Sequence, residues 1–565
     1  MALPWIRYIS AIFFLIWYIV ILLVGYSGFF EILIKFKNRK VLPLKKNKDK
    51  NNNNNNNNNE EEEEEDEELA TLEGVTIIRP IKGIDPELSS CLESSFLQNY
   101  PRDKIQLLFC VDNPHDPSIP LIHKLIQRYP TIDAEILISE NYNEELKISS
   151  DHYGPNPKVN NLAKGFKRAK FDILWIMDSN VWASSNILRN SVITLNSNLN
   201  NGRRVSNSRP VKLVHHVPLA IYIDEPSSTT GSNNAMNDDF ENRVTPVASD
   251  EDFSDTSQVS QLTNRKVSKL YSQSKSKNSI NNKKKKESGI KNIGAKLDEM
   301  FLHTSHSKFY VSLNNLAIAP CVNGKSNIYR RTDLDQSVKL IPYKDSEFFR
   351  DAKVKQDAYK YTRESIAGNA IKLFARYIGE DNMIGIALWE NCNGRTGLTG
   401  DVVIQPLSSK DNYSIKDYSQ RRVRWLRVRK YMVLLATLIE PSTESIVCGI
   451  YGTYAISTLF LQQHPWFSLR VFFVHMLIWM ATDFVQYNIL RHHVKHQMND
   501  IIYLPQWMKN IHMVYPTKGF CVWLCIWCIR EILALPIWII AMFGHEIDWR
   551  GAPFRIKKDL TAEEL

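Results

Sequence analysis

The sequence predicts an α/β domain with a parallel sheet, held at a membrane by hydrophobic helices at both ends of the chain. Three observations in the 565 residues lead to this fold class: an uncharged apolar stretch near the N-terminus, strand-like and helix-like segments that alternate through 73–223, and a second apolar region in the last third. Apolar strands that alternate with helices are typical of parallel sheets covered on both faces.

The N-terminal segment, 1–40, contains the first expected membrane helix. Residues 9–30 carry no charge, and 22 residues are enough to cross a hydrocarbon core of about 30 Å. A cleaved signal peptide is the alternative, but the stretch is long and lacks a clear cleavage site, which favours a signal anchor. Lys35 and Lys37 begin a basic flank, whereas only Arg7 precedes the stretch, so the positive-inside rule predicts a luminal N-terminus and a cytosolic continuation.

Two polar segments interrupt the chain. Segment 41–72 is a basic, poly-Asn and then acidic linker, with nine Asn at 51–59 and nine acidic residues at 60–68. Segment 224–294 runs from an acidic half to a basic half. Both have too little apolar content to pack, so we expect a disordered linker and a disordered insertion. The segments 73–223 and 295–430 then form one globular domain.

Charge and composition exclude several classes of protein. The net charge of +9 comes largely from short basic runs, which are typical of solvated tails or membrane surfaces. The chain contains no nucleic-acid recognition motif, so we expect no nucleic-acid partner. Eight Cys in this length do not make a disulfide scaffold, and the composition is neither collagen-like nor wholly disordered.

The C-terminal segment, 431–565, is expected to hold about three membrane spans, near 443–461, 468–489 and 519–544. Arg530 and Glu531 lie in the middle of the last one. Adjacent charges at that depth usually face protein or water rather than lipid. The side on which the chain ends stays open, because four spans would place the C-terminus in the lumen while its basic residues favour the cytosol. A half-span or an interfacial helix would remove this conflict.

Within the globular domain, the periodicity predicts individual elements. Strands are expected at 75–78, 104–111, 134–139, 171–177 and 211–223, and helices at 86–97, 118–129 and 157–169. Asn156 is the expected N-cap of the last of these helices, with Pro157 at its first position. In open α/β sheets, ligands bind beyond the C-terminal ends of the strands.

Polar side chains follow two of these strand ends. Asp112 and Asp116 come after 104–111, and Asp178 and Asn180 come after 171–177. Each acid has an alternative role as a helix cap. Two oxygen donors separated by one residue, as in Asp178 and Asn180, are suited to Mg²⁺ or Mn²⁺, which also takes phosphate oxygens.

Further candidates lie at helix ends and near the membrane. Lys158 at a helix N-terminus could bind an anion. Glu380 and Asp381 precede a helical run, where an acid is either a favourable helix-end charge or a general base. Arg421 and Arg424, ahead of Trp425, are either membrane-surface residues or guanidinium groups that neutralise a diphosphate.

The order of these residues resembles the ceramide glucosyltransferase family, in a fungal or yeast form. The order is Asp116, Asp178, Asp381 and then Arg421-x-x-Arg424-Trp425, followed by membrane spans. Local matches include 80–86, 156–162, 304–306, 321–324 and the C-terminal tail. The resemblance covers nearly the whole chain apart from the two polar segments, and the order and spacing are more specific than any single motif.

This resemblance implies a GT-A-type, Rossmann-like nucleotide-sugar domain on the cytosolic face of a Golgi or endoplasmic reticulum membrane. The implied reaction moves glucose from UDP-glucose to the primary hydroxyl of ceramide with inversion, giving glucosylceramide, the first step of glycosphingolipid synthesis. A divalent cation, Mg²⁺ or Mn²⁺, and the lipid bilayer are the other implied partners.

The resemblance also implies roles for single residues. Asp381 is the expected base, and Arg421, Arg424 and Trp425 form the expected basic motif. Lys158 and Asp178 are expected near the nucleotide sugar, with Asp178 and Asn180 as metal ligands. His215 matches a nucleotide-binding histidine, while a lone His is more often structural. Asp116 or its neighbour Asp112 is the first motif acid, and Cys321 and Glu380 are expected close to the substrate.

Three other readings fit parts of the pattern. A processive polysaccharide synthase would need more spans and usually has Gln at position 421. A dolichol-phosphate sugar transferase would not explain the Arg-x-x-Arg-Trp segment or the tail. A non-catalytic membrane scaffold, the alternative from another class, would not explain the presence of all three motif acids.

Overall fold

The computed structural model describes residues 4–36, 72–140, 142, 151–223, 292–408, 413–461, 467–499, 505, 507–508, 519–549, 552–557 and 560–565. The predicted linker 41–72, apart from Leu72, lies outside these residues, as does 224–291. The predicted boundary at 294 is wrong by a few positions, because helix α9 already begins at Ile293 and the Gly294 N–H donates to the Tyr413 carbonyl at 3.0 Å. The boundary at 430 likewise falls inside helix α14, Ile415–Met432.

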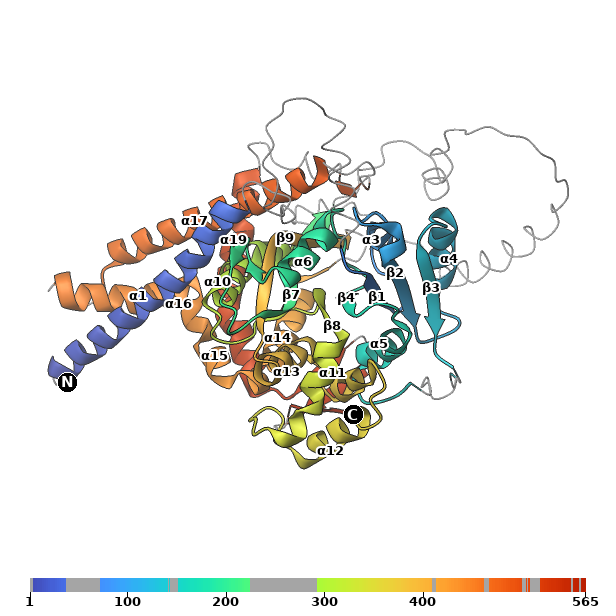
Figure 1. The fold of residues 1–565 in the computed structure, drawn as a ribbon. Coiled ribbons are helices and arrows are strands. Elements are labelled where there is room, and N and C mark those ends of the chain that lie inside the picture. The colour runs from blue at the N-terminus through green and yellow to red at the C-terminus, as the bar shows by residue number, and fades with distance from the viewer. Residues whose placement is uncertain are drawn as a thin grey trace, which may run out of the picture. The chain divides into compact units, whose positions relative to one another are not determined.

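A seven-stranded sheet forms the centre of the globular domain, in the order β3-β2-β1-β4-β8-β7-β9 (Figure 1). The strands are β1 Val75–Ile81, β2 Ile105–Val111, β3 Asp133–Ile138, β4 Ile173–Met177, β7 Val211–Ile223, β8 Ser326–Arg330 and β9 Arg395–Ser408. All five predicted strands are confirmed. The prediction of a wholly parallel sheet is wrong, because β8 runs antiparallel to both β4 and β7. The chain passes through α9 and α10 between β7 and β8, and β8 then enters the sheet between β4 and β7 in the opposite direction to both.

Helices cover both faces of the sheet, as predicted. On one face Ile78 and Leu174 pack with α5, Pro157–Arg168. On the other face Ile77 and Trp175 pack with α3, Leu88–Phe96, α4, Ile119–Arg128, and α6, Ile187–Asn196. The remaining helices of this domain are α9 Ile293–Phe301, α10 Ser307–Leu316, α11 Arg331–Lys339, α12 Ala352–Thr362 and α13 Glu380–Asn391.

The predicted cap of α5 is confirmed. The Asn156 side-chain oxygen accepts hydrogen bonds from the backbone N–H groups of Lys158 at 2.9 Å and Val159 at 3.2 Å. Pro157 occupies the first helical position, where a missing N–H costs no hydrogen bond. The cap therefore sets where α5 starts and where the Lys158 side chain leaves the helix.

In the described part of the chain, three helices are long and apolar enough to cross a membrane. They are α1, Pro4–Lys35, α17, Leu469–Asn499, and α19, Gly519–Phe543. The stretch predicted at 443–461 belongs instead to a bent pair, in which Leu434–Thr443 and Ser445–Leu461 meet at 75°. Pro441 lies in the short 3-10 turn before the bend, and Glu444 at the bend is extended. The pair is either a broken span or a re-entrant loop, so the described residues contain three or four candidate spans.

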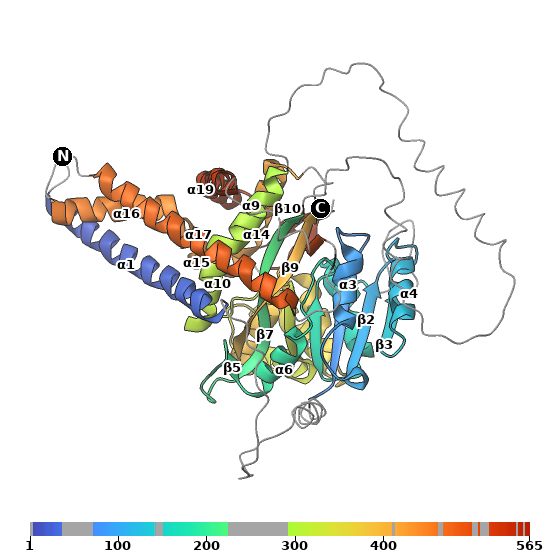
Figure 2. The same cartoon turned by 90° about the horizontal axis from the view of Figure 1, so that it is seen from above.

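The candidate membrane helices pack on the globular domain and on one another. Helix α1 lies along α10 and α16, Ser445–Ile456, and Figure 2 shows α1 and α17 running together. The Lys308 ammonium of α10 meets the Asp483 carboxylate of α17 at 2.7 Å, and both side chains are buried. Arg530 and Glu531 of α19 are also buried, so the prediction that they face protein rather than lipid is confirmed.

The C-terminal region contains a small sheet that the sequence analysis did not predict. Strands β10 Glu546–Trp549, β11 Ala552–Ile556 and β12 Ala562–Glu564 form it. Basic side chains of α14 hold the chain that leads into it. Lys430 Nζ donates to the carbonyl oxygens of Met542 at 3.0 Å and Gly544 at 2.9 Å.

Candidate active site

The site is built around Asp178, which directly follows strand β4. Because β8 is antiparallel to β4, with Met177 opposite Ser326, Lys325 comes to lie beside Asp178. Lys158 approaches from the N-terminus of α5. The Asp178 carboxylate forms ion pairs with both lysines, at 2.9 Å to Lys158 Nζ and 3.1 Å to Lys325 Nζ. Two ammonium groups thus converge at the C-terminal end of β4.

The two lysines dominate the electrostatics of Asp178. Burial alone would raise the pKa of this carboxyl, but the ammonium groups of Lys158 and Lys325 hold it well below its ordinary range. Burial tends to lower the pKa of Lys158, and the carboxylates of Asp178 and Glu380 reverse that effect, so its pKa is raised. Asp178 and Lys158 are therefore both charged at neutral pH.

Glu380 and Asp381 open helix α13 on the other side of Lys158. The Glu380 carboxylate meets Lys158 Nζ at 3.0 Å and accepts a hydrogen bond from the Asn156 side chain at 2.9 Å. Gly324 lies close to both charged partners, since a Cβ on it would be 3.2 Å from Lys158 Nζ and 3.3 Å from Asp381 Oδ2. Lys158 Nζ and Asp381 Oδ2 therefore both lie next to Gly324, and the lysine charge acts on Asp381.

Asp381 has the electrostatics of a general base. Burial and the neighbouring Glu380 carboxylate raise its pKa to about 7, although Lys158 opposes this shift. A group that is half ionised near neutral pH is best able to remove a proton during catalysis. An acid that served only as a favourable charge at the helix N-terminus would not need to be buried, because burial disfavours its ionised form.

Arg421 lies on helix α14, which starts with a capping box formed by Ser414 and Asp417. Its guanidinium donates to the Asp298 carboxylate at 3.2 Å and to the Gln405 side chain at 2.9 Å. Burial would lower its pKa, but the Asp298 carboxylate above all raises it, and Asp178 adds to that effect. The Arg421 guanidinium also lies over the Trp425 ring, 5.0 Å from the centroid.

The other arginine of the motif has a different surrounding. Arg424 donates to the Asp548 carbonyl at 3.2 Å, in the small C-terminal sheet. The structure therefore brings Arg421 near Asp178, with the Trp425 ring beside Arg421, and it joins Arg424 to the small C-terminal sheet. The two arginines are three positions apart on the helix, and both lower the pKa of the Asp298 carboxyl, which burial raises.

The two first-motif candidates lie at the C-terminal edge of the sheet but outside the lysine cluster. Asp116 is buried and accepts from the backbone N–H groups of Gly83 at 2.8 Å and Ser118 at 2.9 Å. Asp112 accepts from the Ser139 hydroxyl at 3.0 Å. Asp116 thus joins the loop after β1 to the loop after β2, and nucleotide contact by either acid stays a prediction.

His215 lies inside strand β7 and is fully buried. One ring nitrogen is hydrogen-bonded to the Tyr310 hydroxyl, and the other lies 3.1 Å from the Asn314 side-chain oxygen. Burial lowers its pKa to about 3, so the ring is neutral. With both nitrogens occupied, its predicted contact with the nucleotide would require rearrangement. Asn314 also donates to the Cys321 carbonyl at 3.0 Å, which links His215 to the loop that holds the half-buried Cys321.

The oxygens of Asp178 and Asn180 already converge on a cation. Lys325 Nζ is 3.1 Å from Asp178 Oδ2 and 3.1 Å from Asn180 Oδ1. No group of three His, Cys, Asp or Glu side chains in the described parts of the chain could hold a metal ion. Mg²⁺ is often held by one or two carboxylates together with substrate phosphates, so this oxygen pair fits such an ion.

Lys325 and Asp298 are not among the predicted site residues. Lys325 comes just before β8, which was not among the predicted strands, and its place beside Asp178 depends on strand pairing. Asp298 lies in α9, at the boundary of the segment expected to be disordered. Its place opposite Arg421, 123 positions along the chain, depends on how α9 packs against α14.

Comparison with known proteins identifies the family. A model described as glycosyl transferase family 21 matches residues 48–202 and 366–562. The chain is 64% identical to the ceramide glucosyltransferase of Candida albicans over 99% of this chain and 98% of that protein. It is 44% identical to the ceramide glucosyltransferase of Komagataella phaffii, over 98% of this chain and 92% of that protein.

A solved structure is similar at a much lower level. The mannosyltransferase PcManGT from Pyrobaculum calidifontis, in complex with GDP-Man and Mn²⁺, matches 95% of this chain and 97% of its own, at 10% identity and a TM-score of 0.34. The sequence relatives are far more similar, and the family model matches parts of both halves of the globular domain. The prediction of an enzyme is confirmed, and a non-catalytic scaffold is excluded: the chain belongs to glycosyl transferase family 21.

Proposed function

We propose that this protein transfers glucose from UDP-glucose to the primary hydroxyl of ceramide, with inversion at the anomeric carbon. The observation that carries the proposal is Asp381, a carboxyl with a pKa of about 7. It lies close to Lys158, whose ammonium pairs with Asp178 at the end of β4. The names of the curated relatives support the choice of sugar and lipid.

Asp381 would act as the base. A primary alcohol is a poor nucleophile at neutral pH, so its proton must leave as the oxygen attacks. The ionised Asp381 carboxylate takes that proton while the oxygen attacks the anomeric carbon on the face opposite UDP. A single displacement of this kind inverts the anomeric centre.

The cationic side chains would stabilise the leaving diphosphate. Lys158 and Lys325 are held at Asp178, and Arg421 is close enough to interact with that carboxylate. Preorganised positive charge directed at the developing negative charge is a large contribution to catalysis. Asp178 and Asn180 would hold a divalent cation, Mg²⁺ or Mn²⁺, which when bound supplies further neutralisation of the diphosphate.

The candidate spans support a reaction at a membrane surface. UDP-glucose is a solute and ceramide is a membrane lipid, so the two substrates meet only where a soluble site reaches the bilayer. Following the basic residues after α1, we propose that the GT-A-type sheet domain is cytosolic in a multi-pass protein of the Golgi or endoplasmic reticulum. The basic helix α14 would lie at the membrane surface.

The test supplies purified full-length protein, reconstituted in lipid, with labelled UDP-glucose and ceramide. The expected product is a β-linked glucosylceramide, identified by mass spectrometry and by the anomeric coupling in its NMR spectrum. Asp381→Asn should keep UDP binding and lose transfer by at least about a hundredfold, because it is isosteric but cannot accept the proton. A polymeric product or a dolichol-linked sugar would support the rival transferases, and normal turnover by Asp381→Asn would exclude its role as the base.

A further inference from the structure

The segment that leads into the candidate base, residues 377–379, is held by Asn156. The Asn156 side-chain amide donates to the Tyr377 carbonyl at 2.7 Å and to the Glu380 carboxylate at 2.9 Å. The same residue caps α5, the helix that carries Lys158. Asn156 therefore joins this segment, which we call the base loop, to the lysine side of the site.

A second set of contacts joins the base loop to the C-terminal tail, the described residues that follow α19. Tyr377 forms an antiparallel bridge with Thr561. Ile378 packs against three buried side chains of the tail, Ile547, Phe554 and Ile556. The end of the tail and the core of its small sheet therefore both contact the base loop.

Leu560 lies between the last two strands of the tail in an unusual backbone conformation. Its φ is +71°, in the left-handed region that a bulky side chain rarely occupies, and its N–H donates to the Lys557 carbonyl at 3.1 Å. The side chain packs against the core of the globular domain. It lines one small apolar space with Gly379 and Met383, which flank Asp381 in the sequence. A conformation of this kind persists only where the surrounding contacts fix it.

The tail also contacts helix α14, which carries Arg421. Arg424 donates to the Asp548 carbonyl at 3.2 Å, and Val428 packs against the buried side chains of the small sheet. A Cβ on Gly379 would lie 3.1 Å from Val428 Cγ1, so the base loop and α14 meet at this point. The tail, the base loop and α14 are therefore in mutual contact.

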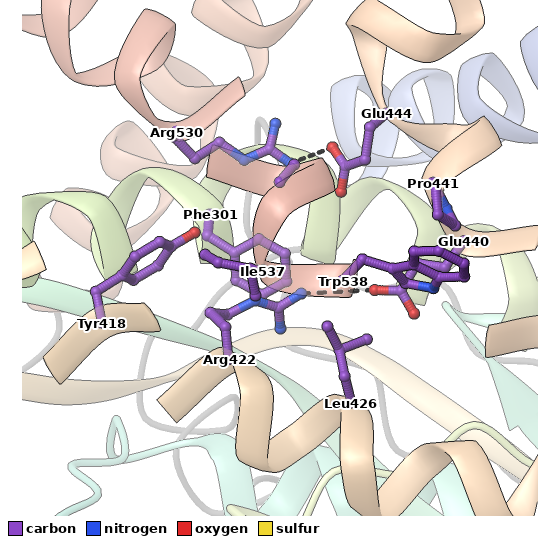
Figure 3. Close-up of a pocket in the computed structure, with 11 residues that line it drawn as sticks. Phe301, Tyr418, Arg422, Leu426, Glu440, Pro441, Glu444, Arg530, Ile537 and Trp538 are labelled. Carbon is purple, nitrogen blue, oxygen red and sulfur yellow. Dashed lines mark hydrogen bonds and ion pairs between the residues drawn. The ribbon is translucent and has the colours of Figure 1, made fainter. Parts of the chain in front are cut away.

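Helix α14 is also held by the candidate membrane helices. Figure 3 shows Arg422 and Leu426 of α14 next to Ile537 of α19, and Arg422 pairs with Glu440 at 3.5 Å. Leu426 and Val428 are two residues apart, which is about 200° around an α-helix, so the two sets of contacts use different faces of α14. The helix therefore gives the tail a fixed surface against which to hold the base loop.

We propose that the C-terminal tail is a positioning element for the base: it holds the base loop against α14 and thereby fixes Asp381 relative to Arg421. Leu560 and Thr561 are the positioning residues, and they act through Asp381. The inference rests on the proposed function and deepens it. In a single displacement, the base and the charge that stabilises the leaving diphosphate act on opposite faces of the anomeric carbon, and a misplacement of about 1 Å can cost about a hundredfold in rate.

The experiment shortens the Leu560 side chain. Leu560→Ala is compared with Leu560→Met, which keeps the volume, and with Leu565→Ala, the matched control, because Leu565 belongs to the same tail and is 51% exposed. Full-length variants in lipid are assayed for glucose transfer, and calorimetry with UDP counts the folded sites. Leu560→Ala should lower kcat per UDP site about tenfold, with the KM for ceramide and the UDP affinity unchanged. Leu560→Met and Leu565→Ala should behave like the wild type.

A second measurement separates positioning of the base from a general structural role. In the Asp381→Asn background the base is already lost, so Leu560→Ala should cause no further loss of the residual transfer rate. Two residues that act independently would instead give the same fractional loss in both backgrounds, because their free-energy effects add.

The other outcomes refute the proposal in distinct ways. Wild-type kcat in Leu560→Ala, an equal loss in Leu565→Ala, a matching loss of UDP affinity, or the same loss in the Asp381→Asn background would each overturn the positioning role. If Leu560→Ala does not fold, Leu560→Asn, whose side chain tolerates the left-handed backbone, is judged by the same criteria. A wild-type protein that makes no glucosylceramide would refute the proposed function itself, whereas an active wild type with an unaffected Leu560→Ala variant refutes only this inference.

Discussion

Replacing Lys158 with Met tests whether its ammonium group tunes Asp381. A Cβ on Gly324 would lie 3.2 Å from Lys158 Nζ and 3.3 Å from Asp381 Oδ2, so the two charged atoms are at most about 6.5 Å apart. At an effective dielectric constant of about 20, this attraction is worth at least about 2.5 kcal/mol, or about two pH units. Lys158 lowers the pKa of Asp381, so its removal raises that pKa.

The expected result is a displaced acid limb in the pH profile of kcat/KM for glucose transfer. The wild-type limb should have its midpoint near the Asp381 pKa of about 7, because only the ionised form accepts the proton. In Lys158→Met the limb should move up by about two pH units, so activity falls by roughly fiftyfold at pH 7 and recovers as the pH rises toward about 9. Initial rates at low substrate concentration, taken between about pH 5.5 and 10, measure the position of this limb.

Lys325→Met is the matched control. Lys325 pairs with the other oxygen of Asp178 at 3.1 Å, and it is not among the groups that shift the pKa of Asp381. Its loss should weaken donor binding and leave the limb in place. A uniform, pH-independent loss in Lys158→Met would show that Lys158 serves the donor alone. An equal displacement in both variants would show that the limb reports the general charge of the site.

Three further results are expected. Gly28→Ala should lower the unfolding stability by about 1–3 kcal/mol in a thermal melt, because its Cβ would overlap the Lys308 carbonyl where α1 crosses α10. Gly25→Ala, whose nearest neighbouring atom is 3.6 Å away, should be neutral or stabilising by up to about 1 kcal/mol; equal melting temperatures would contradict this close crossing. Deletion of 224–291 should keep transfer activity in vitro, and loss of activity in a folded deletion variant would show that the insertion takes part. Chelation of divalent ions should lower transfer, with recovery on adding Mn²⁺ or Mg²⁺; unchanged rates would mean that the cationic side chains suffice for the diphosphate.

Local patterns were enough for much of the fold and for part of the site. Buried strands are visible in the sequence as short apolar runs. The start of α5 is predicted from two adjacent residues, Asn156 and Pro157. Asp178 and Asp381 were found because acids that follow a strand or open a helix stand out against apolar neighbours. The candidate spans at α1, α17 and α19 follow from length and hydropathy alone.

Features that depend on distant pairing were not predictable in this way. The antiparallel β8 brings Lys325 to Asp178, and it is too short and polar to be recognised before its neighbours are known. The same holds for Arg424, whose partner lies 124 positions along the chain in the C-terminal sheet. His215 is a further case, since its contact with the nucleotide stays a prediction while the fold buries the ring and gives both nitrogens a partner.

The sequence by itself determined the kinds of elements, the acids at the strand and helix ends, and the apolar segments long enough to cross a membrane. These depend on neighbours along the chain, where periodicity and capping act. Only the tertiary structure decided which charges meet. Lys158 lies between Asp178 and Glu380. Burial and the neighbouring Glu380 carboxylate together raise the pKa of Asp381 to about 7. Charge interactions and desolvation depend on distance in space, and strand order and helix packing set that distance.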